Sequence, residues 1–328
     1  MQNWFDLPEP KLQWLVDGLI PADGHTAVVG KPKSGKSTFI RNLIASVVKG
    51  CKFLGRSVDL PENTGRVFYL HLDRKDQDWR VARDLRELGI KKDDSSRIIL
   101  RTAAHMTAST FEDRLVWLRK EVVDAKPNLV VIDLLWQFVR AKNSNDYNAV
   151  LDGINTLQDA LRASGYRGAL VVAIHGRKAV STTDQFDDIL GSTGQRGSFS
   201  TIIMLTNRRN EGVYTISSDQ TERDDALGEI PETVITRNPD STLQLGQSVK
   251  DLLKHEKHSK FESDLQRFIQ FVENHPGVEM DALMQSLGMS KKYLLQIVTE
   301  AKAFVRRDGS GIKGDPYKYF VIGGGKHE

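Results

Sequence analysis

The sequence contains a single cysteine, Cys51, in 328 residues. This excludes an intrachain disulfide and a cysteine-based zinc site, and it fits a reducing compartment. The eight histidines are scattered, and none forms the H-E-x-x-H pair of helical zinc sites. An excess of one charge is also lacking, because the formal net charge is only +3. Any binding of nucleic acid must therefore depend on local patches of basic residues.

Long hydrophobic runs are absent as well. No stretch of about 18 consecutive apolar residues occurs, and the first residues lack the basic and apolar blocks of a signal peptide. We therefore expect a cytoplasmic protein with no membrane partner. At about 100–200 residues per domain, the length suggests one large domain and one small domain.

The most informative stretch is AVVGKPKSGKST, residues 27–38, which matches G-x-x-x-x-G-K-[ST] between a β-branched strand and a helix. The two glycines allow a tight turn whose N–H groups point at phosphate oxygens, and the following helix presents its positive end to the same anion. We expect Lys36 to reach the β- and γ-phosphates of ATP and Ser37 to ligate Mg²⁺. The predicted ATP-binding residues are Gly30, Lys31, Pro32, Lys33, Ser34, Gly35, Lys36, Ser37 and Thr38.

Strands and helices alternate after this loop. Strands are expected over residues 65–72, 97–101, 129–132 and 169–174. Helices are expected over residues 38–49, 77–88 and 147–163, with another starting at a capping box, Ser109-Thr110-Phe111-Glu112. The alternation is typical of an α/β fold with a doubly wound, mostly parallel sheet, which binds ligands at the carboxyl ends of its strands. Short strands over residues 201–205, 213–217, 233–236 and 242–245 should extend the sheet as antiparallel edge strands.

Three titratable residues follow predicted strands. Asp133 comes after four apolar residues and is interpreted as a Walker-B carboxylate that holds Mg²⁺; the alternative is a strand-terminal acid without a role. Asp73 ends a strand that we expect beside the P-loop strand, and it is the candidate for orienting the attacking water. It is otherwise a solvated loop acid, with Asp76 or Asp78 as substitutes. His175 is either a γ-phosphate sensor or a structural histidine.

Several other side chains each have two possible roles. Positive charge at the transition state is expected from an arginine finger of a neighbouring subunit, for which the candidates are Lys178, Arg196, Arg208 and Arg209. Each of these is otherwise a solvated surface charge. Trp14 either flanks the adenine base or packs in the core.

The end of the chain shows a different pattern. We predict a first domain over residues 1–245, a polar linker over 246–260 and a second domain over 261–328. The second domain is predicted to have helices over 261–274, 280–287 and 291–304, the last capped by Ser290, and strands over 304–307 and 317–322. Three helices followed by a hairpin are the order of a small winged-helix domain.

Two surfaces are candidates for DNA binding. The first is the loop over residues 176–196, which is otherwise a lid, and its basic residues are Arg177, Lys178 and Arg196. The second is the terminal stretch 287–328, where eight lysines and arginines stand against four acids. Its predicted phosphate contacts are Lys291 and Lys292 on the recognition helix and Arg306, Arg307 and Lys313 on the wing. The alternative role of such a domain is protein docking.

An ordered set of motifs resembles the RepA-like branch of RecA-fold ATPases, found among plasmid and phage replication proteins and related to DnaB-type and KaiC/RadA ATPases. Over about residues 12–245, the motifs are WLVDGLIP, AVVGKPKSGKST, FLGR, GRVFYLHLD, LVVID, AIHGRK and ILGSTGQRGS. The resemblance implies a RecA-like core that hydrolyses ATP with Mg²⁺ at subunit interfaces. It also implies a homo-oligomer, usually a hexamer, that moves along single-stranded DNA and works with replication proteins. A winged helix is frequent in phage and mobile-element members.

Three positions depart from the family pattern. The catalytic glutamate of the family is replaced by Asp73, and Ser200 stands where many relatives carry an aspartate. No arginine ends the stretch 201–206, so the finger falls to Arg208 or Arg209. We predict an ATP-hydrolysing DNA replication helicase of a mobile element. The alternatives are an ATP-switched DNA-binding or helicase-loader protein with slow hydrolysis, and a RadA-like recombination or repair ATPase.

Overall fold

The computed structural model describes residues 13–72, 78–139, 147–176, 198–208, 213–220 and 229–322. The chain divides into two compact units, Met1–Val249 and Lys250–Glu328, each of which is described by itself. Among the described residues, none of the helices has the length and apolar character needed to cross a membrane.

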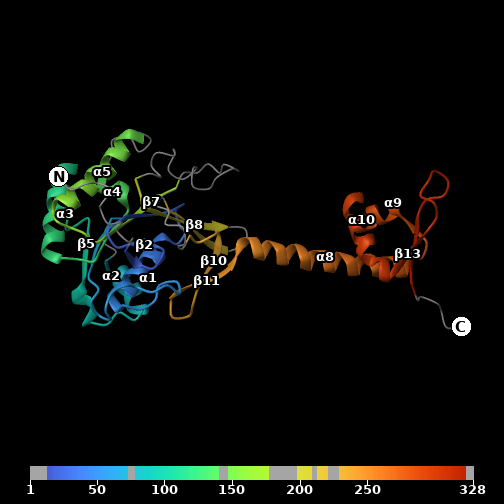
Figure 1. Ribbon diagram of the computed structural model, residues 1–328, viewed down its shortest axis with the longest axis horizontal. Coiled ribbons are helices and arrows are strands. Elements are labelled where there is room, and N and C mark those ends of the chain that lie inside the picture. Colours follow the sequence, from blue (N-terminus) through green and yellow to red (C-terminus); the bar gives the residue numbers. More distant parts are fainter. Residues whose placement is uncertain are drawn as a thin grey trace, which may run out of the picture. The chain divides into compact units, whose positions relative to one another are not determined.

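The first unit is built on a large central sheet with the strand order β11-β10-β9-β8-β3-β7-β6-β4-β5 (Figure 1). The strands are β3 (His25–Gly30), β4 (Val67–His71), β5 (Ile98–Thr102), β6 (Leu129–Asp133), β7 (Ala169–His175), β8 (Thr201–Arg208), β9 (Val213–Gln220), β10 (Thr233–Arg237) and β11 (Leu243–Ser248). Pairing is parallel from β5 to β8 and antiparallel from β8 to β11. The doubly wound, mostly parallel sheet with antiparallel edge strands is therefore confirmed.

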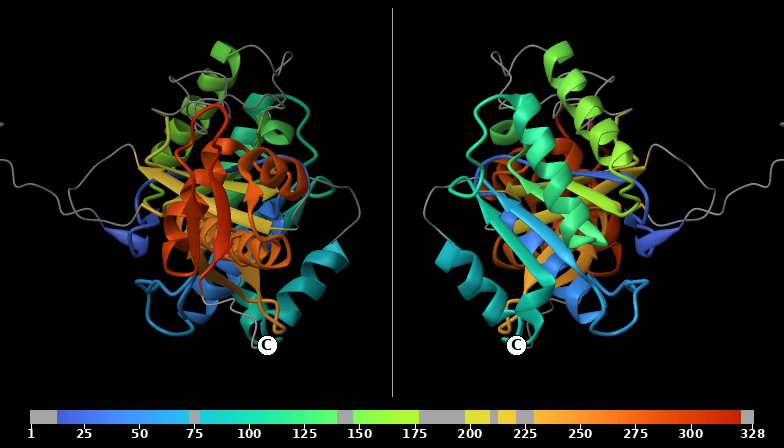
Figure 2. Two further views of the ribbon diagram at one scale, coloured as in Figure 1. Left: turned by 90° about the vertical axis from the view of Figure 1, so that its right-hand side faces the viewer. Right: turned by 90° about the vertical axis from the view of Figure 1, so that its left-hand side faces the viewer.

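Helices cover both faces of this sheet. They are α1 (Lys36–Lys49), α2 (Asp78–Glu87), α3 (Phe111–Ala125), α4 (Leu135–Val139) and α5 (Tyr147–Ala163). Alternate residues of each strand point to opposite faces. Thus Tyr69 and Val131 pack with α1 and α2, whereas Phe68 and Val130 pack with α3, α4 and α5. Figure 2 shows α3 and α5 side by side over one face. A small pair of strands, β1 (Trp14–Val16) and β2 (Ile20–Pro21), precedes β3.

The prediction that β4 lies next to the P-loop strand, β3, is wrong. β3 is flanked by β7 and β8, and both β7 and β6 lie between β3 and β4, the strand that precedes Asp73. Consecutive strands are usually neighbours, which favoured the prediction. Here the chain moves outward to β4 and β5 first, and the later strands β6 and β7, which are buried along almost their whole length, fill the centre.

The start of α3 also differs from the prediction by one residue. The helix begins at Phe111, and its cap is Thr110, whose hydroxyl accepts a hydrogen bond from the backbone N–H of Asp113 at 3.1 Å. The predicted box placed Ser109 in this role. The two neighbouring hydroxyl residues each have an acid three positions later, so the pattern fits both registers.

The second unit has its own core. Its elements are α8 (Val249–Asn274), β12 (Val278–Glu279), α9 (Met280–Leu287), α10 (Lys291–Glu300), a short 3₁₀ turn (Ala301–Ala303), β13 (Val305–Asp308) and β14 (Lys318–Val321). The strands form an antiparallel sheet in the order β12-β14-β13. Phe268, Leu283, Leu294 and Tyr319 are fully buried in one cluster. The predicted helices and hairpin are therefore present, and Ser290 caps α10 as predicted.

The predicted linker over residues 246–260 is not an irregular segment. It contains the end of β11 and the first half of α8. Residues 249–260 carry no proline or glycine, and their leucine, lysine and glutamate residues are strong helix formers. The many polar residues of this segment suggested a linker, but polar residues are equally compatible with a solvent-exposed helix.

The first residue of β3, His25, makes stability depend on pH. Burial, and next the nearby charge of Arg162, lowers the pKa of His25 from 6.5 to about 4. Between these values the unfolded chain binds more protons than the folded chain, so stability is lost as the pH falls from 6.5 towards 4. At 1.36 kcal/mol per pKa unit, the loss reaches about 3 kcal/mol.

We expect the variant His25→Gln to show a weaker loss over this range. Urea unfolding followed by circular dichroism at pH 7 and pH 4.5 would measure it, with the wild-type protein as the reference for all other titrating groups. Equal losses in the two proteins would contradict the prediction.

Candidate nucleotide-binding site

The site is built on the loop that joins β3 to α1. Gly30 has no room for a side chain, because a Cβ there would collide with the carbonyl oxygen of Leu205 and the hydroxyl of Ser34. Gly35 has a φ of 95°, in the left-handed region that favours glycine. Both glycines of the motif are therefore required by the backbone path, and this path leads directly into the N-terminus of α1.

Lys36 lies inside this loop and is only 6% exposed. Its ammonium group donates hydrogen bonds to the carbonyl oxygens of Gly30 at 2.7 Å and Lys31 at 3.0 Å. Within the part of the chain that the structure describes, the buried hydroxyl of Ser34 has no hydrogen-bond partner. The loop thus holds a positive charge and an unused donor next to the end of a helix, which suits an anion.

The two predicted metal ligands are in direct contact. The hydroxyl of Ser37 donates to Oδ2 of Asp133 at 3.1 Å, although 96 positions separate them in the sequence. Asp133 is fully buried, and its other oxygen, Oδ1, has no hydrogen-bond partner among the described residues. A hydroxyl beside a buried carboxylate with an unused oxygen is a suitable donor set for Mg²⁺, which also keeps water and phosphate ligands. Within the described part of the chain, no cluster of three His, Cys, Asp or Glu residues offers another metal site.

Three residues behind Asp133 were not predicted. The hydroxyl of Tyr69 donates to Asp133 Oδ2 at 3.2 Å, and Nδ1 of His71 lies 3.7 Å from the same oxygen. Arg41, on α1, lies near the Tyr69 hydroxyl and forms an ion pair with Asp84 of α2. The signal in the sequence was the alternation in β4, which places Tyr69 and His71 on the face that α1 covers.

These contacts set the ionisation of the site. Burial alone raises the pKa of Asp133, but His71 and the hydrogen bonds from Ser37 and Tyr69 outweigh burial, so that the pKa lies below its ordinary value. Burial raises the pKa of the Tyr69 hydroxyl well above its usual range. Asp133 is therefore held as a carboxylate, and Tyr69 remains a hydrogen-bond donor.

A cavity of about 540 Å³ opens beside the loop. Residues 32–38 form one wall. His175, which is paired with Gly30 in the sheet, also lines the cavity, so the structure brings the candidate sensor to the P-loop. The opposite wall was not predicted and comes from the antiparallel part of the sheet: Leu205, Tyr214, Ile235, Arg237 and Leu243. The side chain of Asn42 in α1 accepts a hydrogen bond from the N–H of Leu243 at 3.0 Å, which ties this wall to the helix.

Several predicted residues cannot be placed in the site. Asp73, Arg177, Lys178, Arg196 and Arg209 lie outside the described residues, as does the side chain of Arg208. The candidate DNA contacts of the second unit are all exposed: Lys291, Lys292, Arg306, Arg307 and Lys313.

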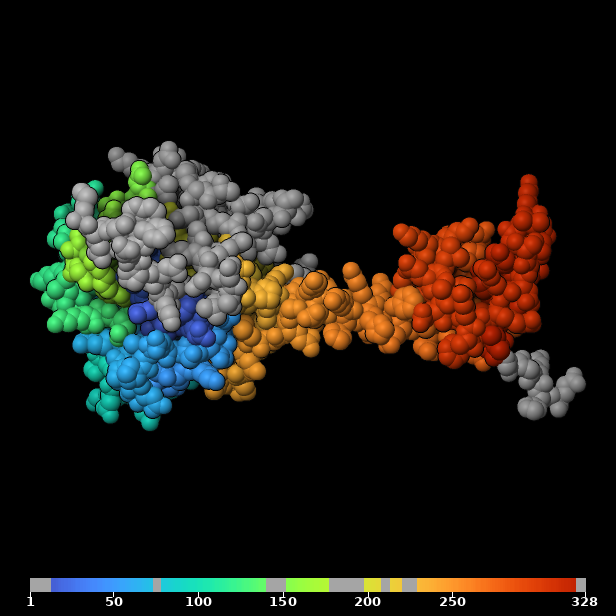
Figure 3. All heavy atoms as spheres, in the orientation of Figure 1, coloured from blue at the N-terminus to red at the C-terminus, as the bar shows by residue number. Residues whose placement is uncertain are grey.

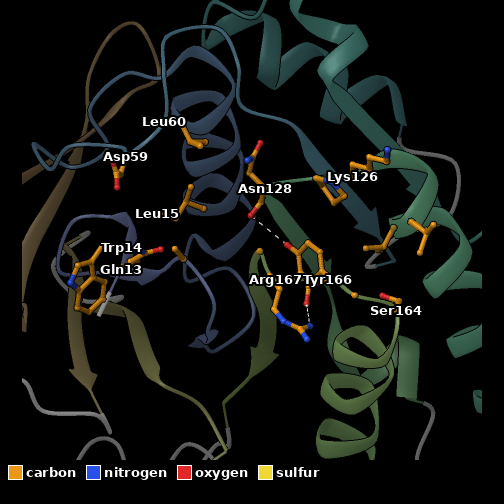
Figure 4. A pocket seen from close by; sticks show the side chains of 16 residues that line it. Gln13, Trp14, Leu15, Asp59, Leu60, Lys126, Asn128, Ser164, Tyr166 and Arg167 are labelled. Atoms are coloured by element: carbon orange, nitrogen blue, oxygen red, sulfur yellow. Dashed lines mark hydrogen bonds between the residues drawn. The ribbon is translucent and has the colours of Figure 1, made fainter. Parts of the chain in front are cut away.

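A second hollow of about 540 Å³ lies at the opposite end of the strands (Figure 4). Trp14 lines it together with Lys126, Asn128 and Tyr166, which are close to the first residues of β6 and β7. Trp14 does not line the P-loop cavity, so the structure does not support a contact with adenine. Ligands of doubly wound sheets bind at the carboxyl ends of the strands, and this hollow is at the amino ends.

Comparisons with known proteins agree with this geometry. A family model described as AAA domain matches residues 2–181, more than half of the chain. The crystal structure of the KaiC-like protein PH0186 from the hyperthermophilic archaeon Pyrococcus horikoshii OT3 aligns with a TM-score of 0.50 and 12% identity, over 71% of this chain and 93% of that chain. A search of curated proteins gave no match. The chain belongs to the AAA domain family, and its first unit has the RecA-like fold of a P-loop ATPase.

Proposed function

We propose that the protein is an ATP-hydrolysing DNA replication protein that works as a ring-shaped helicase. The observation that carries the ATPase activity is the Ser37–Asp133 contact under the P-loop, beside a cavity of nucleotide size. The helicase role is supported by the motif resemblance to RepA-like ATPases and by the exposed basic residues of the second unit.

Each part of the site has a separate task in this proposal. Lys36 leaves the loop carbonyl oxygens and neutralises the β- and γ-phosphates, while Tyr214 and its apolar neighbours cover the nucleobase. Ser37 and Asp133 would hold Mg²⁺, which would supply positive charge to the phosphate oxygens. Arg237 is the one arginine that lines the described cavity, and it donates to Ser241 Oγ at 2.7 Å and Glu87 at 3.3 Å. We assign the charge at the γ-phosphate to a neighbouring subunit, with Arg208 or Arg209 as the candidate residue.

A forked-duplex unwinding assay, run beside sizing chromatography with a non-hydrolysable ATP analogue, tests the proposal. A ring that unwinds the fork in the presence of ATP supports the helicase. A second candidate, an ATP-switched loader with slow hydrolysis, is favoured by the shorter acid Asp73 at the position of the family glutamate. ATP-dependent loading on DNA without unwinding would support this candidate and contradict the helicase.

The second unit is proposed to be a winged-helix domain that binds duplex DNA. Lys291 and Lys292 open α10, and the turn between β13 and β14 projects from the rest of the unit (Figure 3). The guanidinium of Arg307 lies 4.4 Å from the ring centre of Tyr317, and that of Arg306 lies 5.1 Å from the ring centre of Phe320. Stacking on the rings limits the freedom of both exposed arginines, which lowers the entropy lost when they contact phosphates.

We expect the double variant Arg306→Ala/Arg307→Ala to weaken duplex binding by about tenfold and to reduce the slope of log affinity against log salt by about 2, close to one for each lost phosphate contact. ATP hydrolysis without DNA should not change. Fluorescence anisotropy at several salt concentrations measures both effects.

The matched control is Lys254→Ala/Lys257→Ala, which removes two exposed charges from α8. Equal losses in the two double variants would indicate a general charge effect and would contradict a specific contact through β13.

A further inference from the structure

We infer that Tyr69 and His71 are positioning residues that fix the carboxylate of Asp133 so that one of its oxygens stays available to Mg²⁺. This inference rests on the proposed ATPase function, and it assigns a task to residues outside the nucleotide-binding motifs.

The two oxygens of Asp133 have different surroundings. Oδ2 accepts hydrogen bonds from Ser37 at 3.1 Å and from Tyr69 at 3.2 Å, and His71 Nδ1 lies 3.7 Å away. Oδ1 is buried and has no partner in the described protein. A buried carboxylate oxygen without a partner is costly, so a ligand is expected to use it. The protein donors thus occupy one oxygen and leave the other free.

The position of these donors follows from the strand register. His71 of β4 is paired directly with Asp133 of β6, and Tyr69 is paired with Val131 on the same face. The Tyr69 hydroxyl also lies 3.3 Å from His71 Nδ1. Tyr69 is fully buried and His71 is 3% exposed. Aliphatic side chains are usual at such buried strand positions, and the polar atoms here converge on a single carboxylate.

The carboxylate of Asp133 is held from two elements. The hydroxyl of Ser37 on α1 and the hydroxyl of Tyr69 on β4 both donate to its Oδ2. Arg41, one turn after Ser37 on the same face of α1, forms an ion pair with Asp84 of α2. Contacts from both α1 and β4 restrict rotation of the carboxylate more than one hydrogen bond would.

The test is the Mg²⁺ dependence of binding of a fluorescent, non-hydrolysable ATP analogue. Tyr69→Phe keeps the buried ring and removes only the hydroxyl. We expect the Mg²⁺ concentration for half-saturation to rise by about tenfold, as for other groups that orient a metal ligand. Affinity in EDTA should stay at the wild-type value, and saturating Mg²⁺ should restore the hydrolysis rate.

Tyr166→Phe is the matched control. Tyr166 is a partly buried tyrosine whose hydroxyl bonds to the backbone, at 2.7 Å from the carbonyl oxygen of Ala169, and it lies at the other end of the sheet. The Mg²⁺ requirement of the Tyr166→Phe variant should not change. Unchanged Mg²⁺ requirement in Tyr69→Phe, or an equal loss of affinity with Mg²⁺ and with EDTA, would overturn the inference and leave the proposed ATPase intact.

Two further measurements complete the test. If Tyr69→Phe does not fold, His71→Asn takes its place, with a smaller rise in the Mg²⁺ requirement expected and no rise contradicting the inference. A wild-type protein that binds no nucleotide would overturn the proposed function and this inference together.

Discussion

The variant Lys36→Ala is expected to lower kcat for ATP hydrolysis by about 10²–10³-fold, the range found when one charge-stabilising donor is removed from an active site. The ammonium group is already inside the P-loop, where it bonds to the carbonyl oxygens of Gly30 and Lys31. When phosphate enters, the same group is in place to neutralise charge on the transferred phosphoryl group. Steady-state release of phosphate measures the rate, and a nucleotide-binding assay separates binding from chemistry.

Lys49→Ala is the control for this variant. Lys49 is the last residue of α1, and its ammonium group bonds to the carbonyl oxygen of Leu88 at 3.3 Å. The variant Lys49→Ala also removes a lysine from α1, but at the end of the helix that is far from the loop. It should therefore hydrolyse ATP at the wild-type rate. Comparable rates for Lys36→Ala and the wild type would show that the P-loop is not the hydrolytic site.

The variant Asp133→Asn is expected to lower kcat by about a hundredfold through loss of the negative charge that holds the metal. Asparagine has nearly the same size, so the packing of β6 should survive. Nucleotide affinity in EDTA should change little, whereas the Mg²⁺ requirement should rise steeply. A titration of hydrolysis with Mg²⁺ measures this effect.

Asp124→Asn removes one exposed carboxylate from α3 and serves as the control. Two outcomes separate a metal ligand from a structural acid. If Asp133 is a metal ligand, its replacement raises the Mg²⁺ requirement and leaves the thermal stability unchanged. A lower melting temperature with an unchanged Mg²⁺ requirement would assign Asp133 to the fold alone.

The parts of the site that are local in sequence could be predicted. The P-loop, its strand and its helix are continuous, and the glycines of the motif occupy positions where a side chain or a negative φ does not fit. Asp133 was identified because the residue that follows a central parallel strand reaches the ligand edge of the sheet. Its contact with Ser37 confirms that the two candidate metal ligands meet.

The parts that depend on strand order could not be predicted in this way. Periodicity locates β4 but does not say that β7 and β6 separate it from β3. For the same reason, the partners of Asp133 on β4 were missed, because only the register places His71 beside it. The far wall of the cavity was missed as well, since Tyr214 and Leu243 come from antiparallel strands, β9 and β11, that carry no motif.

The two walls of the cavity come from different parts of the chain, so sequence changes can affect one wall without the other. The family match ends at residue 181, before β8 begins, so it contains the phosphate-binding wall but not Tyr214, Ile235 or Leu243. Under the proposed function, substitutions in the later strands would change the part of the cavity assigned to the nucleobase and leave the P-loop unchanged. A recombinant fragment cut at the end of the family match would keep the P-loop and Asp133 but would lose the cavity lining from Leu205, Tyr214, Ile235, Arg237 and Leu243.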